Sequence, residues 1–540
     1  MNGAEYIIEI LRKKDTQYIF GLFGDIETKF AQAISNSSIN WIGVHNEKTG
    51  GFIADIYSRV SNKPGIVFTT LGPGGTNLAT ALANATQDRS ALIAISDQVD
   101  VKDCIIDTHQ YIDFVKAFHP NTGITKYTAL VKNINSLEHI FDKAFYLATT
   151  EPKGAVHISI PSSLFSQQLP ITFQRRNKSY QIKYNNKSTL SYKNLLNTIT
   201  SPKPGLVIVG GLIERTHSQK EFRDFVEKIG APVLKTFRGI NALPSSHSQC
   251  LGTISRHIQS SFIEIVKEVG YVLLVGYDYN EGVKPSLWEQ RKDSVYNISS
   301  FDNRVGQVFN PPTLIHDIPQ LFRKILHDIP ASNKRPHFPF VKIDSNLKKQ
   351  TKKALQVRNA ALHPGHIIKA INKLYTNNTI IICDVGLNKY YSGLLLKSTS
   401  KNKIIFSNGL STMAFSAGAL GAKIADPTKD IIVLTGDGGF LMDLQEIITS
   451  LQYRQQIVWI VFNNGGLGLI EQAQMLDESV DEGFGTEFGK VNFQQLATAF
   501  GIAGKYVPKA KDVYPILKRV KESHQSAIID VKVEYRNPSN

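Results

Sequence analysis

Residues 431–464 read IIVLTGDGGFLMDLQEIITSLQYRQQIVWIVFNN. Four apolar residues, 431–434, predict a strand that runs into the turn Gly436-Asp437-Gly438. A second apolar run, 457–462, predicts another strand and ends at Asn463-Asn464. Between the two, apolar side chains recur at the three- and four-residue spacing of one helix face, at Leu441, Leu444, Ile447, Ile448 and Leu451. The stretch therefore predicts a βαβ unit with both strands in one parallel sheet.

Asp437 and Asn464 follow the two strands of this unit directly. Ligands of parallel sheets bind at the carboxyl ends of the strands, so we expect these two side chains to share one ligand. Carboxylate and amide oxygens suit Mg²⁺, which in turn binds phosphate oxygens. The glycines at 436, 438 and 439 allow the backbone to approach a diphosphate closely. The alternative is an ordinary strand-to-helix turn in which Asp437 only caps the helix.

Length and composition limit the classes of protein to which the chain can belong. Its 540 residues exceed what one core accommodates and predict about three domains. The hydrophobic content of 42% and charged content of 20% are typical of soluble globular proteins. The sequence contains no run of eighteen apolar residues, so we expect no membrane helix, and the first residues lack the apolar core of a signal peptide.

Charge and cysteine content predict where the protein works and what it does not bind. The formal charge is +15, but the basic residues are scattered and have no interleaved aromatics. We therefore expect a solvated surface and no nucleic-acid partner. The three cysteines, Cys104, Cys250 and Cys383, lack metal-ligand spacing and predict reduced thiols in a cytoplasmic protein.

Short apolar runs alternate with helical stretches in three parts of the chain, which polar segments separate. We predict an α/β protein of three doubly wound domains with mainly parallel sheets, over residues 1–172, 190–331 and 355–540. The predicted strands outside the βαβ unit are 18–22, 39–44, 65–70, 92–96, 155–161, 206–209, 233–235, 271–275 and 380–383.

The Gly-Asp-Gly segment with its Asn pair resembles the thiamine diphosphate and Mg²⁺ motif of the thiamine-dependent decarboxylase and synthase superfamily. The resemblance covers nearly the whole chain and is closest to the acetolactate synthase branch. It implies that Asp437 and Asn464 bind the metal and that the backbone carbonyl of Gly466 completes the protein's share. It also assigns a pyrimidine-binding role to the first domain, a central position to the second and diphosphate binding to the third.

Glu47 is the candidate for the acid–base chemistry that a thiamine cofactor needs. It follows a predicted strand in the segment HNEKTGGFIADIYSRVSNKPG, which resembles the pyrimidine-binding segment of this superfamily. There a carboxylate bonds to N1′ of the pyrimidine ring and stabilises the reactive imino tautomer, and a partly desolvated Glu suits this role. The alternative is a surface Glu in the first turn of a helix.

The resemblance implies further contacts with the cofactor. Gly72, Pro73 and Asn77 match a loop beneath the pyrimidine ring, and Leu467 begins another matching segment. Ser411 would present its carbonyl to the 4′-amino group, and Met413 would support the thiazolium ring. The loop at the diphosphate oxygens would contain Asp384, Gly386, Leu387 and Asn388.

The segment Asp107-Thr108-His109-Gln110-Tyr111-Ile112-Asp113 resembles one shared by catabolic acetolactate synthases and carboxyethylarginine synthases. It implies that His109 and Gln110 border the substrate, although a solvent-exposed His beside a capping Thr is the ordinary alternative. The central domain, with VGYDYNE at 275–281, looks most like carboxyethylarginine synthase. However, Lys389-Tyr390 stands where that enzyme has Arg-His, and Lys cannot form a bidentate fork with a phosphate.

The leading interpretation is a thiamine-dependent carboligase, a transferase that makes an enamine adduct from a 2-oxo acid or short aldehyde and transfers it to an acceptor. One alternative joins a three-carbon aldehyde phosphate to an amino acid amine. A 2-oxo acid decarboxylase and a non-catalytic cofactor-binding relative also remain. The resemblance implies a homodimer or homotetramer with active sites between chains. FAD is not expected, because Val209-Gly210-Gly211 lacks the dinucleotide fingerprint.

Overall fold

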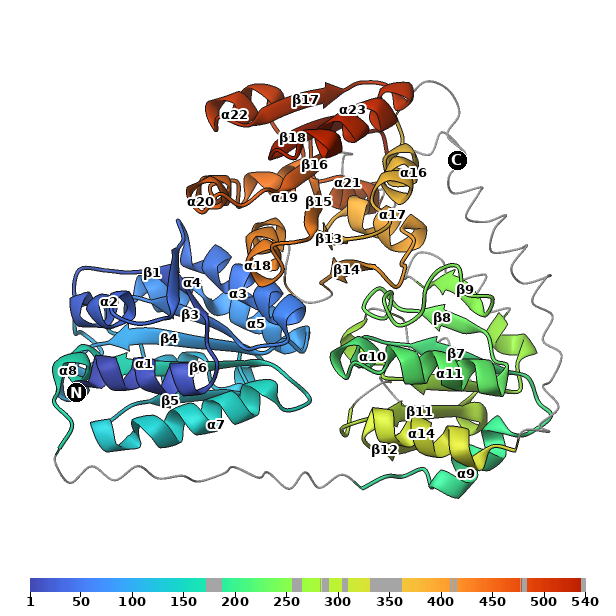
Figure 1. Ribbon diagram of the computed structural model, residues 1–540, viewed down its shortest axis with the longest axis horizontal. Helices are drawn as coiled ribbons and strands as arrows, with labels where there is room; N and C mark the ends of the chain where they lie inside the picture. The colour runs from blue at the N-terminus through green and yellow to red at the C-terminus, as the bar shows by residue number, and fades with distance from the viewer. Residues whose placement is uncertain are drawn as a thin grey trace.

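Three six-stranded sheets, in which every strand pair is parallel, form the framework of the computed structural model. The structure describes residues 1–170, 187–254, 265–281, 283, 291–303, 309–330, 362–407, 410, 415–475, 477 and 483–535. The three sheets belong to three α/β domains, blue, green and orange in Figure 1, which meet in a triangle. The predicted fold class is confirmed.

The first domain has the strand order β2-β1-β3-β4-β6-β5. Its strands are β1 (Tyr18–Leu22), β2 (Asn40–Gly43), β3 (Gly65–Thr69), β4 (Leu92–Gln98), β5 (Tyr127–Leu130) and β6 (Ala155–Pro161). Its main helices are α1 (Gly3–Lys13), α2 (Thr28–Ser35), α3 (Glu47–Ser61), α4 (Pro73–Asn77), α5 (Ala79–Gln87), α7 (Leu137–Thr149) and α8 (Ser162–Ser166). The fully buried strands β3, β4 and β6 read as near-continuous apolar runs, because helices cover both faces of the sheet.

The third domain repeats this topology with the order β14-β13-β15-β16-β18-β17. Its strands are β13 (Thr379–Cys383), β14 (Asn402–Phe406), β15 (Asp430–Gly436), β16 (Val458–Asn463), β17 (Ala503–Val507) and β18 (Ala527–Lys532). Its helices include α16 (Pro364–Leu374), α17 (Leu387–Leu395), α18 (Gly418–Ala425), α21 (Gly468–Gln474), α22 (Phe493–Ala499) and α23 (Ala510–Ser523). The single helix face predicted between Leu441 and Leu451 is divided between α19 (Asp437–Leu441) and α20 (Glu446–Gln452).

The central domain has a different topology, with the order β12-β11-β10-β7-β8-β9. Its strands are β7 (Gly205–Val209), β8 (Val233–Lys235), β9 (Cys250–Thr253), β10 (Tyr271–Val275), β11 (Val295–Ser299) and β12 (Thr313–Ile315). Helices α9 (Tyr192–Ile199), α10 (Leu212–Arg215), α11 (Gln219–Ile229) and α14 (Ile318–Asp328) accompany them. The strand order reverses between β7 and β10, the arrangement typical of dinucleotide-binding folds.

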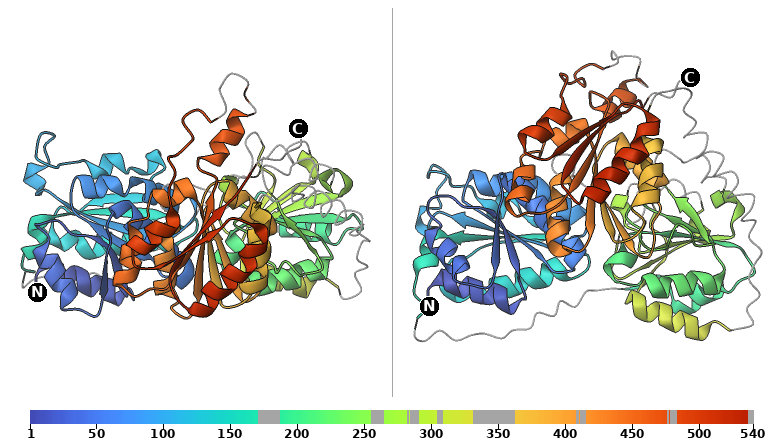
Figure 2. Two further views of the ribbon diagram at one scale, coloured as in Figure 1. Left: turned by 90° about the horizontal axis from the view of Figure 1, so that it is seen from above. Right: turned by 45° about the horizontal axis from the view of Figure 1, so that its top comes forward.

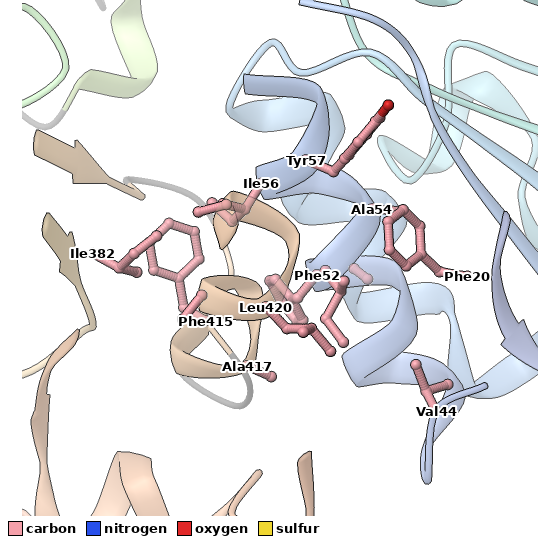
Figure 3. Close-up of a cluster of buried hydrophobic side chains, with 14 of the residues drawn as sticks. Phe20, Val44, Phe52, Ala54, Ile56, Tyr57, Ile382, Phe415, Ala417 and Leu420 are labelled. Atoms are coloured by element: carbon pink, nitrogen blue, oxygen red, sulfur yellow. The ribbon is translucent and has the colours of Figure 1, made fainter. Parts of the chain in front are cut away.

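The first and third domains share a hydrophobic core along α3 and α18. Figure 3 shows Phe52 and Ile56 of α3 beside Phe415 and Leu420 of the third domain. Glycines make the close approach possible, since a Cβ atom at Gly421 would collide with the backbone carbonyl of Ile53. The two domains therefore pack as one body, and Figure 2 shows the same contact from two further directions.

Ion pairs at the junction of the three domains hold the central domain against the other two. Arg215 of α10 pairs with Glu151 of the first domain, with Nε and Oε1 2.8 Å apart. Lys403 of β14 pairs with Glu214 of α10 at 3.0 Å. Arg238, just after β8, lies 3.5 Å from Asp88 of the first domain, and Arg89 pairs with Asp278 at 2.7 Å. Because these groups are largely buried, the pairing compensates for the cost of removing each charge from water.

Two predictions concern the chain as a whole: its domain boundaries and its lack of membrane helices. The predicted domain boundaries fall at residues 172–190 and 331–355, largely outside the described residues, and stay a prediction. Among the described residues, no helix combines the length and apolar character needed to cross a membrane.

Candidate functional site

Asp437 lies at the carboxyl end of β15, where it begins α19, and is 3% exposed. Its Oδ1 accepts the N–H of Gly438 at 2.8 Å. Its Oδ2 accepts the N–H of Gly465 at 2.7 Å and that of Gly466 at 3.2 Å. Burial raises the pKa of Asp437 to about 6, and the backbone hydrogen bonds oppose that increase. The carboxylate thus ties the turn after β15 to the turn after β16.

The two asparagines at the end of β16 face different partners. Asn463 donates from Nδ2 to Oδ1 of Asp530 on β18 at 2.9 Å. Asn464 lines, with Asp437, a cavity of about 510 Å³; the described residues of its walls all belong to the third domain, Lys490 and Lys532 among them. Asp437 and the second Asn therefore lie together, as predicted.

Gly466 lies beside these two side chains and is held by backbone hydrogen bonds. A Cβ atom there would lie 2.6 Å from the carbonyl oxygen of Thr486. The carbonyl of Gly466 accepts the N–H of Gly468 at 3.0 Å. A carbonyl oxygen has two lone pairs, so one remains for a further partner.

Asn388 joins the ends of β13 and β15, where the strand order of the sheet reverses. It donates from Nδ2 to the carbonyls of Asp384, at 3.0 Å, and Leu434, at 3.2 Å. Gly386 precedes it with φ +132°, a conformation that L side chains rarely adopt. Leu387 follows Gly386 as the first residue of α17 and is buried. Ligands bind at such reversal points, so the predicted residues 384–388 border the candidate site.

The glycines after β15 lie against other predicted residues. A Cβ atom at Gly439 would lie 2.6 Å from Oδ2 of Asp384, and one at Gly438 would lie 2.9 Å from Cδ2 of Leu467. Asp384 itself accepts the hydroxyl of Thr435 at 2.9 Å, and burial raises its pKa to about 7. Its carboxyl therefore adds less than a full negative charge near neutral pH.

Glu47 is the first residue of α3, after the capping residue Asn46. Its Oε2 accepts the Nδ2 of Asn77, at the end of α4, at 2.7 Å. Its Oε1 faces the Gly-rich turn, 3.5 Å from the position that a Cβ atom of Gly74 would take. Gly72 and Pro73 begin this turn, and Gly72 has φ +58°. The first-domain residues predicted from sequence thus form one cluster around a half-buried carboxylate.

His109 and Gln110 are exposed, on the connection that follows β4. Gln110 rests on the Gly-rich turn, because a Cβ atom at Gly72 would lie 2.8 Å from its carbonyl oxygen. Gln98, the last residue of β4, holds the connection by donating to the carbonyl of Ile112 at 2.9 Å. The segment also exposes Ile106, with 86% of its surface accessible.

Two neighbours of Glu47 are hydrogen-bonded to the third domain of the same chain. The N–H of His45 donates to Oε1 of Glu446 at 3.1 Å, and the hydroxyl of Thr49 donates to the same oxygen. Sequence reasoning missed Glu446, whose position in α20 gives no local signal. The predicted Ser411 and Met413 lie outside the described residues.

Family comparisons match all three domains. The description "Thiamine pyrophosphate enzyme, N-terminal TPP binding domain" matches residues 1–117, and the C-terminal TPP binding domain of the same enzymes matches residues 384–531. The central domain of these enzymes matches residues 192–325. The chain belongs to the thiamine pyrophosphate-dependent enzymes. Both clusters described above fall within the two TPP binding matches of this family.

Acetolactate synthases are similar to this thiamine enzyme over nearly its full length. A probable acetolactate synthase large subunit of Methanococcus aeolicus is 26% identical over 558 residues, covering 99% of this chain and 92% of its own. The acetolactate synthase of Bacillus subtilis is 25% identical and covers 100% and 94%. An acetolactate synthase large subunit of Lactococcus lactis is 28% identical and covers 98% and 92%. The chain is a thiamine-dependent enzyme of the synthase and transferase type within this superfamily.

Proposed function

We propose that the chain is a carboligase that uses thiamine diphosphate and Mg²⁺ to join a 2-oxo acid, or a short aldehyde, to an acceptor. The observation that carries the proposal is the presence of two clusters in one chain. Glu47 lies with Asn77 in the first domain, and Asp437 lies with Asn464 in the third. The similarity to acetolactate synthases supports the same class of reaction.

The residues around Asp437 suit a magnesium diphosphate. Asp437, the side chain of Asn464 and the carbonyl of Gly466 would be its oxygen ligands, which Mg²⁺ prefers. The turn at Gly438 and Gly439 leaves no room for a side chain and keeps the backbone close to the ligand. When bound, thiamine diphosphate supplies a carbon nucleophile that attacks a carbonyl group.

Glu47 would hold the proton of the cofactor's pyrimidine ring at N1′. Asn77 binds Oε2 and so fixes the rotation of the carboxylate, which leaves Oε1 at the Gly-rich turn for the ring nitrogen. The position is half-buried, which strengthens a charge-assisted hydrogen bond relative to one in water. Gln110, on the same turn, and His109 beside it would position the substrate and transfer protons to it.

We infer that the active site forms between two copies of the chain. Within the described part of the chain, the Glu47 carboxylate is hydrogen-bonded to Asn77 of its own domain, whereas the described residues around the cavity at Asp437 belong to the third domain. A two-fold pair of chains would complete each cluster with the partner's other cluster. The exposed Ile106 would be covered by the partner chain in that pair. With its cysteines free, we place this assembly in the cytoplasm.

Three contacts favour an unphosphorylated substrate over the aldehyde phosphate of the alternative reaction. Lys389 is buried and donates to the backbone carbonyl of Ser407, and burial lowers its pKa to about 8. Asp278 pairs with Arg89 of the first domain, and Glu281 bonds within the central domain, so structural contacts account for both acidic residues of the segment VGYDYNE at 275–281.

We propose that the central domain takes no FAD. Dinucleotides bind where the strand order reverses, here at the ends of β7 and β10. Glu281 occupies that place: its Oε1 accepts the N–H of Gly211 at 2.8 Å, and its Oε2 accepts the hydroxyl of Thr236. These are the donors that a dinucleotide phosphate would need, so the residues present do not fit that group.

The decisive experiment is incubation of the purified protein with Mg²⁺, thiamine diphosphate and pyruvate, with products read by mass spectrometry. A carboligase releases less acetaldehyde than CO₂, whereas a decarboxylase releases them equally. A second incubation with glyceraldehyde 3-phosphate and an amino acid tests the alternative reaction. The proposed reaction would be overturned by equal release of CO₂ and acetaldehyde from pyruvate, or by a product that forms only from glyceraldehyde 3-phosphate and the amino acid.

A further inference from the structure

Helix α20 of the third domain lies along the free edge of strand β2 in the first domain. Strand β2 is an edge strand of its sheet, so its outward N–H groups need partners from outside the sheet. The hydroxyl of Tyr453, directly after α20, accepts the N–H of Gly43 at 2.7 Å. Figure 1 shows α20 on the side of the third domain that faces the first. Another domain of the same chain thus covers the edge of β2.

Glu446, the first residue of α20, contacts the segment just beyond this strand and is 3% exposed. Its Oε1 accepts the N–H of His45 at 3.1 Å and the hydroxyl of the fully buried Thr49. Its Oε2 accepts the hydroxyl of Thr449. Donors from two domains therefore converge on one buried carboxylate. Two of them, His45 and Thr49, each lie two residues from Glu47.

The same hydrogen bonds fix the imidazole of His45. Its Nδ1 lies 2.8 Å from Oγ1 of Thr449. A hydroxyl has only one proton, and that of Thr449 goes to Glu446, so Nδ1 of His45 must be the donor in this bond. Glu446 thus holds the backbone of His45 directly and its side chain through Thr449.

These contacts act on the start of helix α3, where the backbone is least constrained by the helix itself. Glu47 is the first residue of α3, and the first N–H groups of a helix have no partner within it. Asn46 caps the helix by accepting the N–H of Lys48 at 3.0 Å, and Asn77 holds the Glu47 carboxylate at 2.7 Å. Both of these contacts lie within the first domain, whereas Glu446 ties the same turn to the third.

We propose that Glu446 is a positioning residue for Glu47. By holding His45 and Thr49, it sets where the Glu47 carboxylate stands relative to the pyrimidine ring of the cofactor. A hydrogen bond to a ring nitrogen needs a distance of about 2.7–3.2 Å, so a small displacement of the helix start is enough to lose it. This role rests on the proposed function, whereas the contact between the domains does not.

Thr49→Val tests the role, because it removes the hydroxyl and keeps the shape of the side chain. Exchange of the C2 proton of bound thiamine diphosphate, followed by NMR after an acid quench, should slow by about 10-fold or more, since a misplacement of 1 Å can cost about 10²-fold. Cofactor affinity, from titration calorimetry, should stay near that of the wild type, because the diphosphate cluster is unchanged. Thr49→Ser restores the hydroxyl and should restore the exchange rate.

Tyr453→Phe is the matched control, because it removes a hydrogen bond between the same two elements at the other end of α20. It should exchange at the wild-type rate even where its melting temperature falls as much as that of Thr49→Val. Thr449→Val, which releases the other oxygen of Glu446, should also slow exchange and decides the matter where Thr49→Val does not fold. Wild-type exchange in the folded variants, or an equal loss in Tyr453→Phe, would overturn the positioning role.

A double-mutant cycle in melting temperature, measured without cofactor, tests the contact itself. In a Glu446→Ala background, Thr49→Val should lower the melting temperature clearly less than it does in the wild type, because the shared hydrogen bond is already lost. Additive losses would overturn the contact. Non-additive losses together with no C2 exchange in the wild type would overturn the proposed function, and the positioning role with it, while the contact would stand.

Discussion

Asp437 serves the candidate metal site in two ways at the scale of a single residue. Its oxygens accept three backbone N–H groups, which holds the turns after β15 and β16 in register before any ion binds. In the proposed site, the same oxygens would be the anionic ligand of Mg²⁺, and the ion would replace some of these hydrogen bonds. Preorganisation of this kind reduces the cost of ordering the site upon binding.

Replacement of Asp437 by Ala should therefore weaken cofactor binding by at least about 10–100-fold, since the only carboxylate ligand is lost. Titration calorimetry with thiamine diphosphate, with Mg²⁺ and with excess chelator, measures this. Asp530→Asn is the control, because Asp530 lines the same cavity but bonds to Asn463. Equal affinity of the wild-type protein with and without chelator would contradict the metal assignment.

Glu47→Gln should keep the fold and cofactor binding but lose turnover. The amide preserves volume and the bond to Asn77, yet it cannot stabilise a proton on the pyrimidine ring. Loss of such acid–base function costs about 10²–10⁴-fold. Exchange of the cofactor's C2 proton, followed by NMR after an acid quench, isolates this step. Exchange at the wild-type rate in the variant would refute the role of Glu47.

At the scale of elements, the connection after β4 combines an anchored base with an exposed tip. Gln98 anchors the start of this connection through its bond to the carbonyl of Ile112. Gln110 packs on Gly72 and itself has φ 57°, an uncommon conformation for a residue other than glycine. Backbone strain of this kind costs about 1–3 kcal/mol and clusters at functional sites, which agrees with a substrate-facing role.

His109→Ala should accordingly leave C2 exchange near the wild-type rate and lower product formation. The loss is of order ~10²-fold if the imidazole transfers a proton, and smaller if it only positions substrate. His119→Ala is the control, because it removes another exposed imidazole from the same connection. Unchanged rate and product ratio in His109→Ala would make this residue part of the ordinary surface.

The elements show why part of the structure follows from sequence and part does not. Most strands buried on both faces were predicted within two residues, because continuous apolar runs identify them, but the largely buried β11 and β18 were missed. The edge strand β5 was missed, since its four residues are half-buried and follow no clear alternation. The proximity of Asp437 and Asn464 could be predicted because each follows one of two parallel strands, whose carboxyl ends lie at the same edge of the sheet. The bonds of Glu446 to His45 and Thr49 depend on how the first and third domains pack and could not be predicted from local patterns.

At the scale of the whole molecule, the first and third domains form one packed body that carries two separate clusters. Their shared core includes Phe52, Phe415 and Leu420. Glu47 cannot therefore approach Asp437 of its own chain by free domain movement. In the proposed assembly, a second chain would complete the site without any such movement.

Mixing two inactive variants tests this arrangement. In a homodimer of either variant, Glu47→Gln or Asp437→Ala, both active sites carry the substitution. Refolding them together at equal amounts should restore about a quarter of wild-type activity, since half of the dimers are mixed and each has one intact site. A different affinity tag on each variant, with sequential capture on both tags, confirms that mixed species form. Mixed dimers without activity would place each site within a single chain.

The seam between α3 and α18 also affects how the protein is made. The α3 face that packs against Gly418 and Gly421 emerges from the ribosome early, and its cover follows roughly 370 residues later, on the order of 20–70 s at usual elongation rates. During that interval the α3 face lacks the cover that α18 later provides. Synthesis of this chain thus includes a prolonged vulnerable phase, in which a trigger-type chaperone or slow translation would decide the yield of folded protein.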